Sequence, residues 1–162
     1  MFKKYVFLGL LLTLLPFTGR ALMVKLDLEN LTQNSNLVIR ATVENMRCSW
    51  NAEHRRIFTF ATLTVKEPVK GSALTGAINV RYPGGVVGDT AYIVEDTPQF
   101  RPGEEVIVFL KDRNPEGVRE VYGWFQGKYT VENNVVKENR LPVQTFLNQI
   151  KAVVQDMQRR GQ

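Results

Sequence analysis

The strongest constraint on the fold lies in residues 100–129, where a turn, an apolar run and an aromatic, glycine-rich segment follow one another. Pro102 and Gly103 mark the turn, and the run Val-Ile-Val-Phe-Leu at 106–110 is apolar at every position. A strand that is apolar throughout is buried on both faces, which predicts a central place in a sheet. Because turn residues follow at 112–117, we predict a hairpin of two long strands at the centre of a β core.

Further strands are predicted from alternation and from turn residues. Residues 57–66 alternate most clearly and are rich in Thr and Phe, which favour a pleated, half-buried surface. We expect Pro68 and Gly71 to end this strand and residues 47–56 to form a polar loop before it. The other expected strands are 37–46, 78–82, 91–94, 104–111, 119–125, 128–131 and 135–137.

The connections between these strands also have recognisable sequences. Asn133-Asn134 is typical of a tight hairpin, because Asn tolerates a positive φ. The glycine-rich stretch 83–88 lacks the Lys-Ser/Thr of a phosphate-binding loop, so a wide turn is expected there. Gly123, inside the strand expected at 119–125, indicates a bulge or a tight bend.

Two helices complete the predicted fold. A short helix is expected within 26–36, with Asp27 as a cap. A C-terminal amphipathic helix is expected over 142–160, because apolar residues recur there at helical spacing. These residues are Val143, Phe146, Leu147, Ile150, Val153, Val154 and Met157. The fold class is therefore predicted to be mainly β: a small closed or partly open barrel, OB-like, with a C-terminal amphipathic helix that docks on the barrel or on a partner.

The N-terminus has the architecture of a secretory signal peptide. Lys3 and Lys4 precede the apolar run 5–15, and Gly19-Arg20-Ala21 provides small residues for cleavage. We predict a signal peptide at 1–21, a single domain at 22–162, and export to the periplasm or the extracellular space. No later stretch is long and apolar enough to span a membrane. Removal of the leader lowers the net charge from +5 to +2, which weakens any prediction of nucleic-acid binding.

Catalytic and metal-binding residue sets are scarce in this sequence. His54 is the only histidine and Cys48 the only cysteine, so the sequence has few of the residues that a catalytic triad or a zinc site requires. We therefore predict no enzyme activity, no catalytic residues, no metal and no cofactor. Cys48 is expected to be a partly buried apolar residue, with an intermolecular disulfide as the alternative. A hydrolase that uses carboxylates from Glu95, Asp96, Glu104 and Glu105 is a further alternative.

Aromatic and polar residues near the glycines are the candidates for binding. They are Trp50, Tyr82, Tyr122, Trp124, Gln126 and Lys128. Strand alternation would place Tyr122 and Trp124 on one face, opposite Gly123 and Phe125. Such aromatic residues either belong to the core or form an exposed platform for a ligand.

Several short motifs occur together in this chain. They are Leu31-Thr-x-x-Ser35, Ser49-Trp50, residues 62–71, Gly84-Gly85, Phe100-x-Pro-Gly-Glu104, Val108-Phe-Leu110 and Gly123-x-x-Gln-Gly-Lys128. With these motifs the chain resembles a family of uncharacterised exported bacterial proteins. Its strand pattern is similar to the netrin-like OB barrel of tissue inhibitors of metalloproteinases. This similarity implies protein binding. Those inhibitors use an N-terminal cysteine and disulfides, whereas this chain has only Cys48 and an expected mature N-terminus at Leu22.

The sequence thus predicts an exported, non-enzymatic binding module. A protein partner is favoured, with a secreted peptidase among the candidates. An OB-like protein that binds envelope glycans or nucleic acid is the alternative, and a carboxylate-dependent hydrolase is the third possibility.

Overall fold

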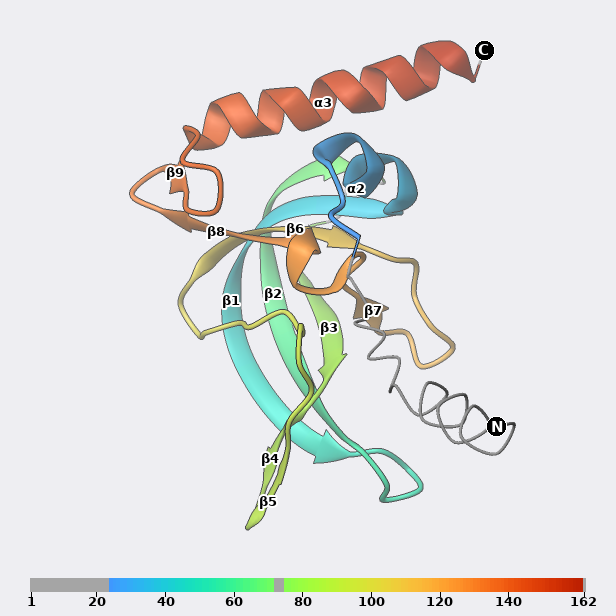
Figure 1. Ribbon diagram of the computed structural model, residues 1–162, viewed down its shortest axis with the longest axis vertical. Helices are drawn as coiled ribbons and strands as arrows, with labels where there is room; N and C mark the ends of the chain where they lie inside the picture. The colour runs from blue at the N-terminus through green and yellow to red at the C-terminus, as the bar shows by residue number, and fades with distance from the viewer. Residues whose placement is uncertain (1–23, 72–74, 162) are drawn as a thin grey trace, which may run out of the picture.

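The computed structural model describes residues 24–71 and 75–161, so the predicted signal peptide at 1–21 lies outside the described residues. Nine strands, two α-helices and one 3₁₀ helix make up the described chain (Figure 1). In order they are α2 (Leu28–Asn34), β1 (Leu37–Trp50), β2 (Ile57–Lys70), β3 (Ala77–Pro83), β4 (Gly85–Val87), β5 (Thr90–Tyr92), β6 (Glu105–Leu110), β7 (Arg119–Glu120), η1 (Trp124–Gly127), β8 (Lys128–Glu132), β9 (Val135–Val136) and α3 (Val143–Arg160). No helix within these residues is long and apolar enough to cross a membrane.

Seven of the strands form one sheet in the order β7-β3-β2-β1-β6-β8-β9. All neighbours are antiparallel except β3 and β7, which are parallel. The mainly β class with a C-terminal helix is confirmed. In this strand order β7 and β9 are the first and last strands. Strands β4 and β5 form a separate ribbon that extends beyond one end of the sheet (Figure 1).

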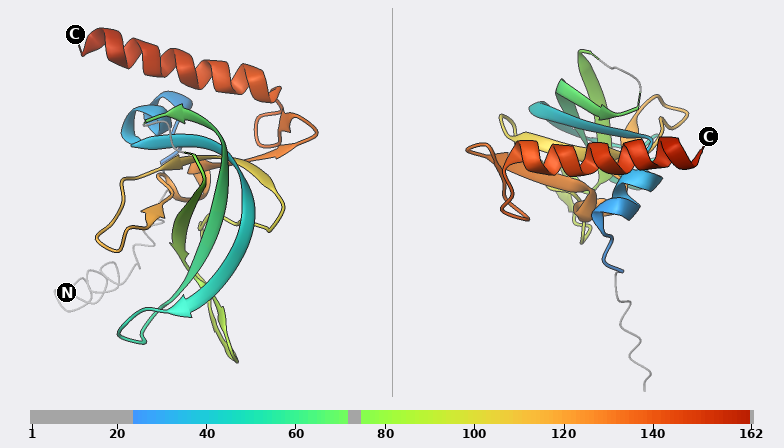
Figure 2. Two further views of the ribbon diagram at one scale, coloured as in Figure 1. Left: turned by 180° about the vertical axis from the view of Figure 1, so that it is seen from behind. Right: turned by 90° about the horizontal axis from the view of Figure 1, so that it is seen from above.

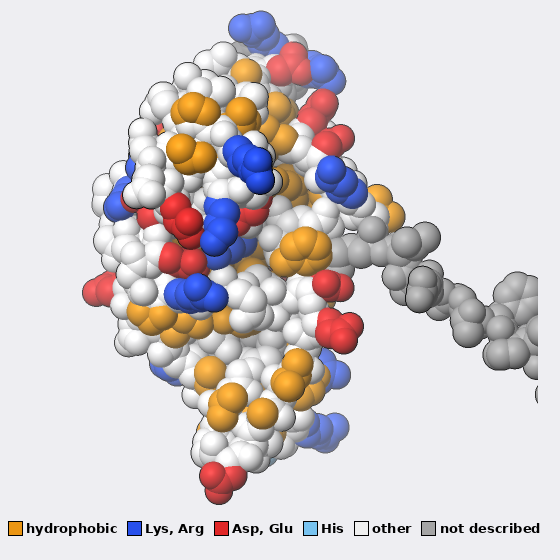
Figure 3. All heavy atoms as spheres, turned by 60° about the vertical axis from the view of Figure 1, so that its left-hand side comes forward, with side chains coloured by type: hydrophobic (Ala, Val, Ile, Leu, Met, Phe, Trp, Pro, Cys, Tyr) orange, Lys and Arg blue, Asp and Glu red, His pale blue; other side chains and the backbone are white. Residues whose placement is uncertain are grey.

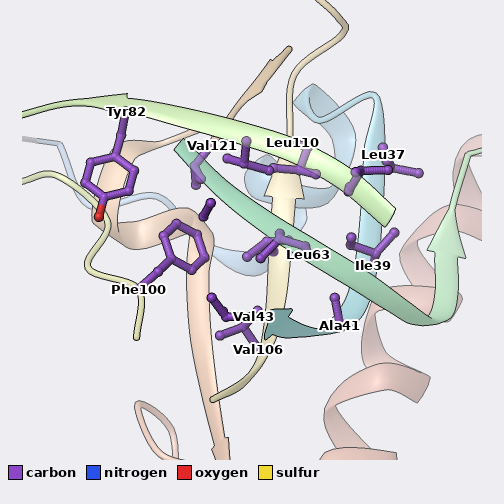
Figure 4. Close-up of a cluster of buried hydrophobic side chains, with 14 residues drawn as sticks. Leu37, Ile39, Ala41, Val43, Leu63, Tyr82, Phe100, Val106, Leu110 and Val121 are labelled. Atoms are coloured by element: carbon purple, nitrogen blue, oxygen red, sulfur yellow. The ribbon is translucent and has the colours of Figure 1, made fainter. Parts of the chain in front are cut away.

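Strand β6 lies between β1 and β8 and is buried on both faces, as its composition predicts. Val106, Val108 and Leu110 pack into a cluster enclosed by the curved strands β1, β2 and β3. Ile107 and Phe109 point the other way, into a second cluster beneath the helices. Figure 4 shows the first cluster, with the Tyr82 and Phe100 rings facing each other at one end. The two apolar cores are thus joined through one strand.

The two α-helices cover the second cluster. Leu31 of α2 is fully buried, and α3 buries its first two turns through Val143, Phe146, Leu147 and Ile150. Viewed from above, α3 crosses the top of the sheet beside α2 (Figure 2). Both predicted helices are confirmed, including the docking of the C-terminal helix on its own chain. Asp27 caps α2, since its Oδ1 accepts a hydrogen bond from the Asn30 amide at 2.7 Å.

The polar loop predicted at 47–56 was wrong over its first half. β1 continues to Trp50, and only residues 51–56 form the turn. Polar residues such as Arg47 and Ser49 occupy the solvent side of the strand. Their weak strand propensity is offset by the pairing of this part of β1 with β2. The prediction that Pro68 ends β2 was also wrong. A register shift between Val38 and Ile39 creates a bulge beside Pro68, where a missing N–H is tolerated.

The strand predicted at 119–125, and with it the hairpin of two long strands, was wrong. β7 contains only Arg119–Glu120 and pairs with β3, although Val121 forms an isolated bridge with Leu110. The chain then turns at Gly123, whose φ of 73° is left-handed, into the 3₁₀ helix η1. The alternation of apolar and polar residues could not reveal this turn, because the positive φ of the single residue Gly123 ends the strand.

The glycine-rich segment 83–88, predicted as a wide turn, contains the short strand β4. Gly85 has a φ of 135°, and a Cβ there would lie 2.6 Å from the Sγ of Cys48. Only glycine fits, because the β4 backbone packs directly on the half-buried Cys48 and on Thr59. The Asn133-Asn134 hairpin is confirmed, with both residues at positive φ.

Lys70, the last residue of β2, caps the C-terminal end of α2. Its Nζ donates to the carbonyl oxygens of Thr32, Gln33 and Ser35 at 2.5, 3.1 and 2.6 Å. We expect Lys70→Met to lower the free energy of unfolding by about 2 kcal/mol, because three carbonyls lose a charged donor. Urea denaturation measures this value. Lys137→Met, which removes an exposed lysine paired with Glu132, should change stability by less than about 0.5 kcal/mol.

The Glu105 carboxylate lies between the Arg40 guanidinium, at 2.5 Å, and the Lys66 ammonium. Burial alone would raise the pKa of Glu105, but the hydrogen bonds and charges of Lys66 and Arg40 outweigh it and lower the pKa. The ion pairs therefore stabilise the fold fully above the pKa of glutamate in the unfolded chain. This stabilisation is lost as the pH falls through the lower pKa of the folded state.

We expect Glu105→Gln to lower the free energy of unfolding by about 1–2 kcal/mol at about pH 7, and the difference from the wild type to vanish near about pH 2. Urea titrations at the two pH values measure it. Glu132→Gln, which removes an exposed acid, serves as the control. A difference that stays constant with pH would contradict the assigned role of the carboxylate.

Candidate functional site

The described chain contains an apolar groove of about 670 Å³, which we call the η1 groove. It lies between the segment before α2, η1, β8, the loop after β9 and the first half of α3. Its apolar lining consists of Leu26, Leu28, Phe125, Tyr129, Leu141 and Phe146. Its polar lining consists of Lys25, Gln126, Lys128, Glu138, Asn139 and Gln149. Hollows of this size with a few polar groups at the rim commonly bind ligands.

Gln126 fixes one wall of the η1 groove. Its Oε1 accepts a hydrogen bond from the Leu26 amide at 2.8 Å, and its Nε2 donates to the Val24 carbonyl at 3.1 Å. The side-chain amide thus pairs with the backbone as a neighbouring strand would. Gly123 allows the close approach, because a Cβ there would lie 2.7 Å from Leu26 Cδ1.

The floor of the groove is formed by Tyr129. Its ring centroid lies 4.7 Å from that of Phe146 and 5.8 Å from that of Phe109. Burial, together with the charge of Glu138, raises the pKa of the Tyr129 hydroxyl. The Glu138 carboxylate accepts the Thr130 amide hydrogen with both oxygens, at 3.0 and 2.9 Å. This bond takes the place of a strand partner at the edge of β8.

Three large apolar side chains are exposed in the η1 helix and in the segment before α2, and Phe125 is the one of them that lines the groove. Trp124 and Phe125 are 45% and 47% exposed, and Val24 is 75% exposed. Trp124 also has a φ of 58°, which is unfavourable for a residue with a Cβ. In the space-filling view, apolar atoms lie beside the point where the described chain begins, with charged side chains around them (Figure 3).

The six predicted binding residues do not form one site. Gln126 and Lys128 line the η1 groove, whereas Trp124, the first residue of η1, lines a separate small pocket with Tyr82, Pro98 and Glu120. Tyr122 is half-buried and does not line the groove, and its hydroxyl donates to Asn30 Oδ1 of α2 at 3.2 Å. Trp50 ends β1 and stacks on His54 with ring centroids 6.1 Å apart.

Tyr82 and Lys128 are held inside the structure. Tyr82 is 7% exposed, packs on Phe100 with centroids 5.8 Å apart, and has a pKa that burial raises. The alternative that the aromatic residues belong to the core is therefore right for Tyr82. The Lys128 side chain is 10% exposed, with its Nζ 3.0 Å from Glu104 and 5.6 Å from the centroid of the Phe100 ring. It anchors β8 to the turn before β6.

The apolar groove residues that are absent from the six predicted binding residues are Leu26, Leu28, Phe125, Tyr129, Leu141 and Phe146. Phe125 belongs to the aromatic segment, but the expected strand placed it opposite Trp124. The 3₁₀ helix instead leaves both exposed. The pattern Gly-x-x-x-Gly at 123–127 is the signal in the sequence, because it allows a tight turn in place of a strand.

The acidic residues considered for catalysis are separated by their partners. Glu104 pairs with Lys128, and Glu105 pairs with Arg40 and Lys66. Glu95 and Asp96 are exposed in the loop after β5. Within the described residues, no group of three or more His, Cys, Asp or Glu side chains is arranged to hold a metal ion. No known protein-family model matches the chain, and no curated protein matches it significantly in sequence.

We expect Gln126→Ala to release the segment before α2, because both backbone hydrogen bonds of this segment to the Gln126 amide are lost. Hydrogen exchange at the Leu26 amide should become at least about tenfold faster. Gln144→Ala is the matched control, since that side chain contacts only Asn148 on the surface of α3. Unchanged exchange at Leu26 would show that the Gln126 amide does not hold this wall.

Proposed function

We propose that this protein is an exported, non-enzymatic module that binds another protein, and that the η1 groove with Trp124 and Phe125 is its docking surface. The observation that carries the proposal is the exposed Phe125 side chain in the lining of an apolar groove, next in sequence to the exposed Trp124. Aromatic residues in such positions dominate the energetics of protein interfaces.

The backbone of the site supports the same proposal. Trp124 keeps an unfavourable φ while its side chain remains nearly half exposed, so burial of the ring does not offset the strain. Strain that the fold does not require is typical of functional positions. Gln126 and Gly123 hold the neighbouring wall in place, so the partner meets a preformed surface.

The partner that suits the groove is a protein segment with several apolar side chains. The groove volume of about 670 Å³ exceeds what one side chain fills, and its lining is mainly apolar. The polar rim around Lys25, Glu138 and Gln149 would contact the polar edge of such a segment. The similarity to metalloproteinase inhibitors makes a secreted peptidase the first class of partner to test.

An OB-like, partly open barrel is also part of this proposal. β1, β2 and β3 form a meander, β6 returns beside β1, and β7 runs parallel to β3. The end of β7 and the residues after it also meet the β6 end: the Lys111 amide donates to the Glu120 carbonyl at 2.9 Å, and the Tyr122 amide donates to the Phe109 carbonyl at 2.8 Å. These bonds support a route around the barrel through β1, β2, β3, β7 and β6.

The test uses tagged residues 22–162 as bait in envelope extract and culture medium, with mass spectrometry as the readout. Wild type and Val135→Ser should enrich the same saturable protein, because Val135 is exposed on β9, outside the groove lining. Phe125→Ser should lose it. With the purified partner, calorimetry should show a loss of about 2 kcal/mol, roughly 30-fold in affinity, for Phe125→Ser.

Two results would contradict the proposal. One is the absence of any protein that the wild-type bait enriches in a saturable way. The other is a partner that Phe125→Ser binds as tightly as the wild type. An inhibition assay follows only if the enriched protein is a peptidase.

A further inference from the structure

The solvent side of β1, β2 and β3 carries an unusual set of side chains, far apart in sequence from the η1 groove. Thr59, Ala61 and Leu63 of β2 face the core, so Phe58 and Phe60 face outward and remain half-buried. Arg47 of β1 is paired with Phe60, and Phe60 is paired with Arg81 of β3. We call Arg47, Phe58, Phe60 and Arg81 the arginine–phenylalanine face.

The guanidinium groups lie on the rings. The Arg47 Cζ is 4.6 Å from the centroid of Phe60, and the Arg81 Cζ is 5.0 Å from the centroid of Phe58. A guanidinium stacked on a ring loses side-chain freedom before any ligand arrives, and its edge of N–H donors stays available. The face is therefore organised for groups that accept two parallel hydrogen bonds.

The two arginines differ in charge compensation. Arg81 is paired with Glu116 and, at 3.2 Å, with Glu120, so its charge is already neutralised. Arg47 is exposed, and no carboxylate among the described residues lies within ion-pair distance of it. Arg47 is thus a positioned cation that lacks an anion.

The turn after β1 adds further cations and a hollow. Arg55 and Arg56 are exposed there, and their amides both donate to Asn51 Oδ1, at 2.8 and 2.9 Å, which fixes the turn. A hollow of about 310 Å³ lies beside the turn, and Trp50, Phe58, Phe60 and Arg81 contribute to its lining.

We propose that the arginine–phenylalanine face binds a polysaccharide that carries carboxylate groups, with Arg47 as the residue that pairs with a carboxylate. Sugar hydroxyls suit the mixed polar and aromatic lining of the hollow, and a carboxylate matches the geometry of a stacked guanidinium. Nucleic acid fits less well. Nucleic-acid binding rests on many phosphate contacts, whereas of the two stacked guanidiniums Arg47 is the one without a carboxylate partner among the described residues.

The experiment measures binding of polygalacturonate to residues 22–162 by calorimetry at low salt. The same polymer with fully methyl-esterified carboxyl groups is the matched ligand control. We expect binding of the charged polymer alone, and a loss of about tenfold in affinity for Arg47→Gln. Arg47→Lys should give an intermediate affinity, because it keeps the charge but not the planar, two-point donor.

Arg159→Gln removes an equal charge from the exposed end of α3 and should bind like the wild type, as should Phe125→Ser from the η1 groove. Phe125→Ser also separates this proposal from the proposed function, since only the latter depends on Phe125. No binding of polygalacturonate, equal binding by Arg47→Gln, equal binding of the esterified polymer, or preference for single-stranded DNA would each overturn the proposal. Circular dichroism of each variant checks that the fold is retained.

Discussion

The whole structure depends on the burial of β6 from both sides. Its odd and even residues belong to different apolar clusters, so the curved meander of β1–β3 and the helical layer share one strand as a common wall. Burial of this kind is favourable by about 25 cal/mol per Å² of apolar surface, and a five-residue apolar run exploits both faces of the strand. The segments before and after β6 therefore have little freedom, and the positions of Glu104, Glu105 and Val121 follow from it.

Sequence reasoning succeeded where burial alone decides the conformation. The apolar run at 106–110, the alternation of β2 and the helical spacing of Val143, Phe146 and Ile150 each reflect one buried face, and each was found. It failed where the backbone is decided by one residue or by a distant contact. Gly123 turns the chain away from a strand that alternation favours, and the bulge beside Pro68 depends on the register of β1, which no local pattern contains.

The candidate site shows the same division. Gln126, Lys128 and Trp124 were selected as polar or aromatic residues near glycines; Gln126 and Lys128 line the groove, and Trp124 does not. Most of the apolar lining was missed, because Leu26 and Leu28 come from a segment about 100 residues away in sequence from Gln126, and their contact with it depends on tertiary packing and on the Gln126 side-chain amide. Tyr82 and Trp50 share the composition of the site but not its location, since Tyr82 faces the core from β3 and Trp50 lies at the end of β1.

The two proposed surfaces differ in the force that would hold a ligand. The η1 groove offers apolar area, so its binding would persist at high salt and depend on the shape of the partner. The arginine–phenylalanine face offers a positioned charge at the solvent boundary, so its binding would weaken as salt screens it. The lining of the η1 groove comes from η1, β8, α3 and the segments beside them, whereas the arginine–phenylalanine face lies on the solvent side of β1, β2 and β3. A protein built this way could hold a partner at one surface while an acidic polymer occupies the other, since no residue of the first lining belongs to the second.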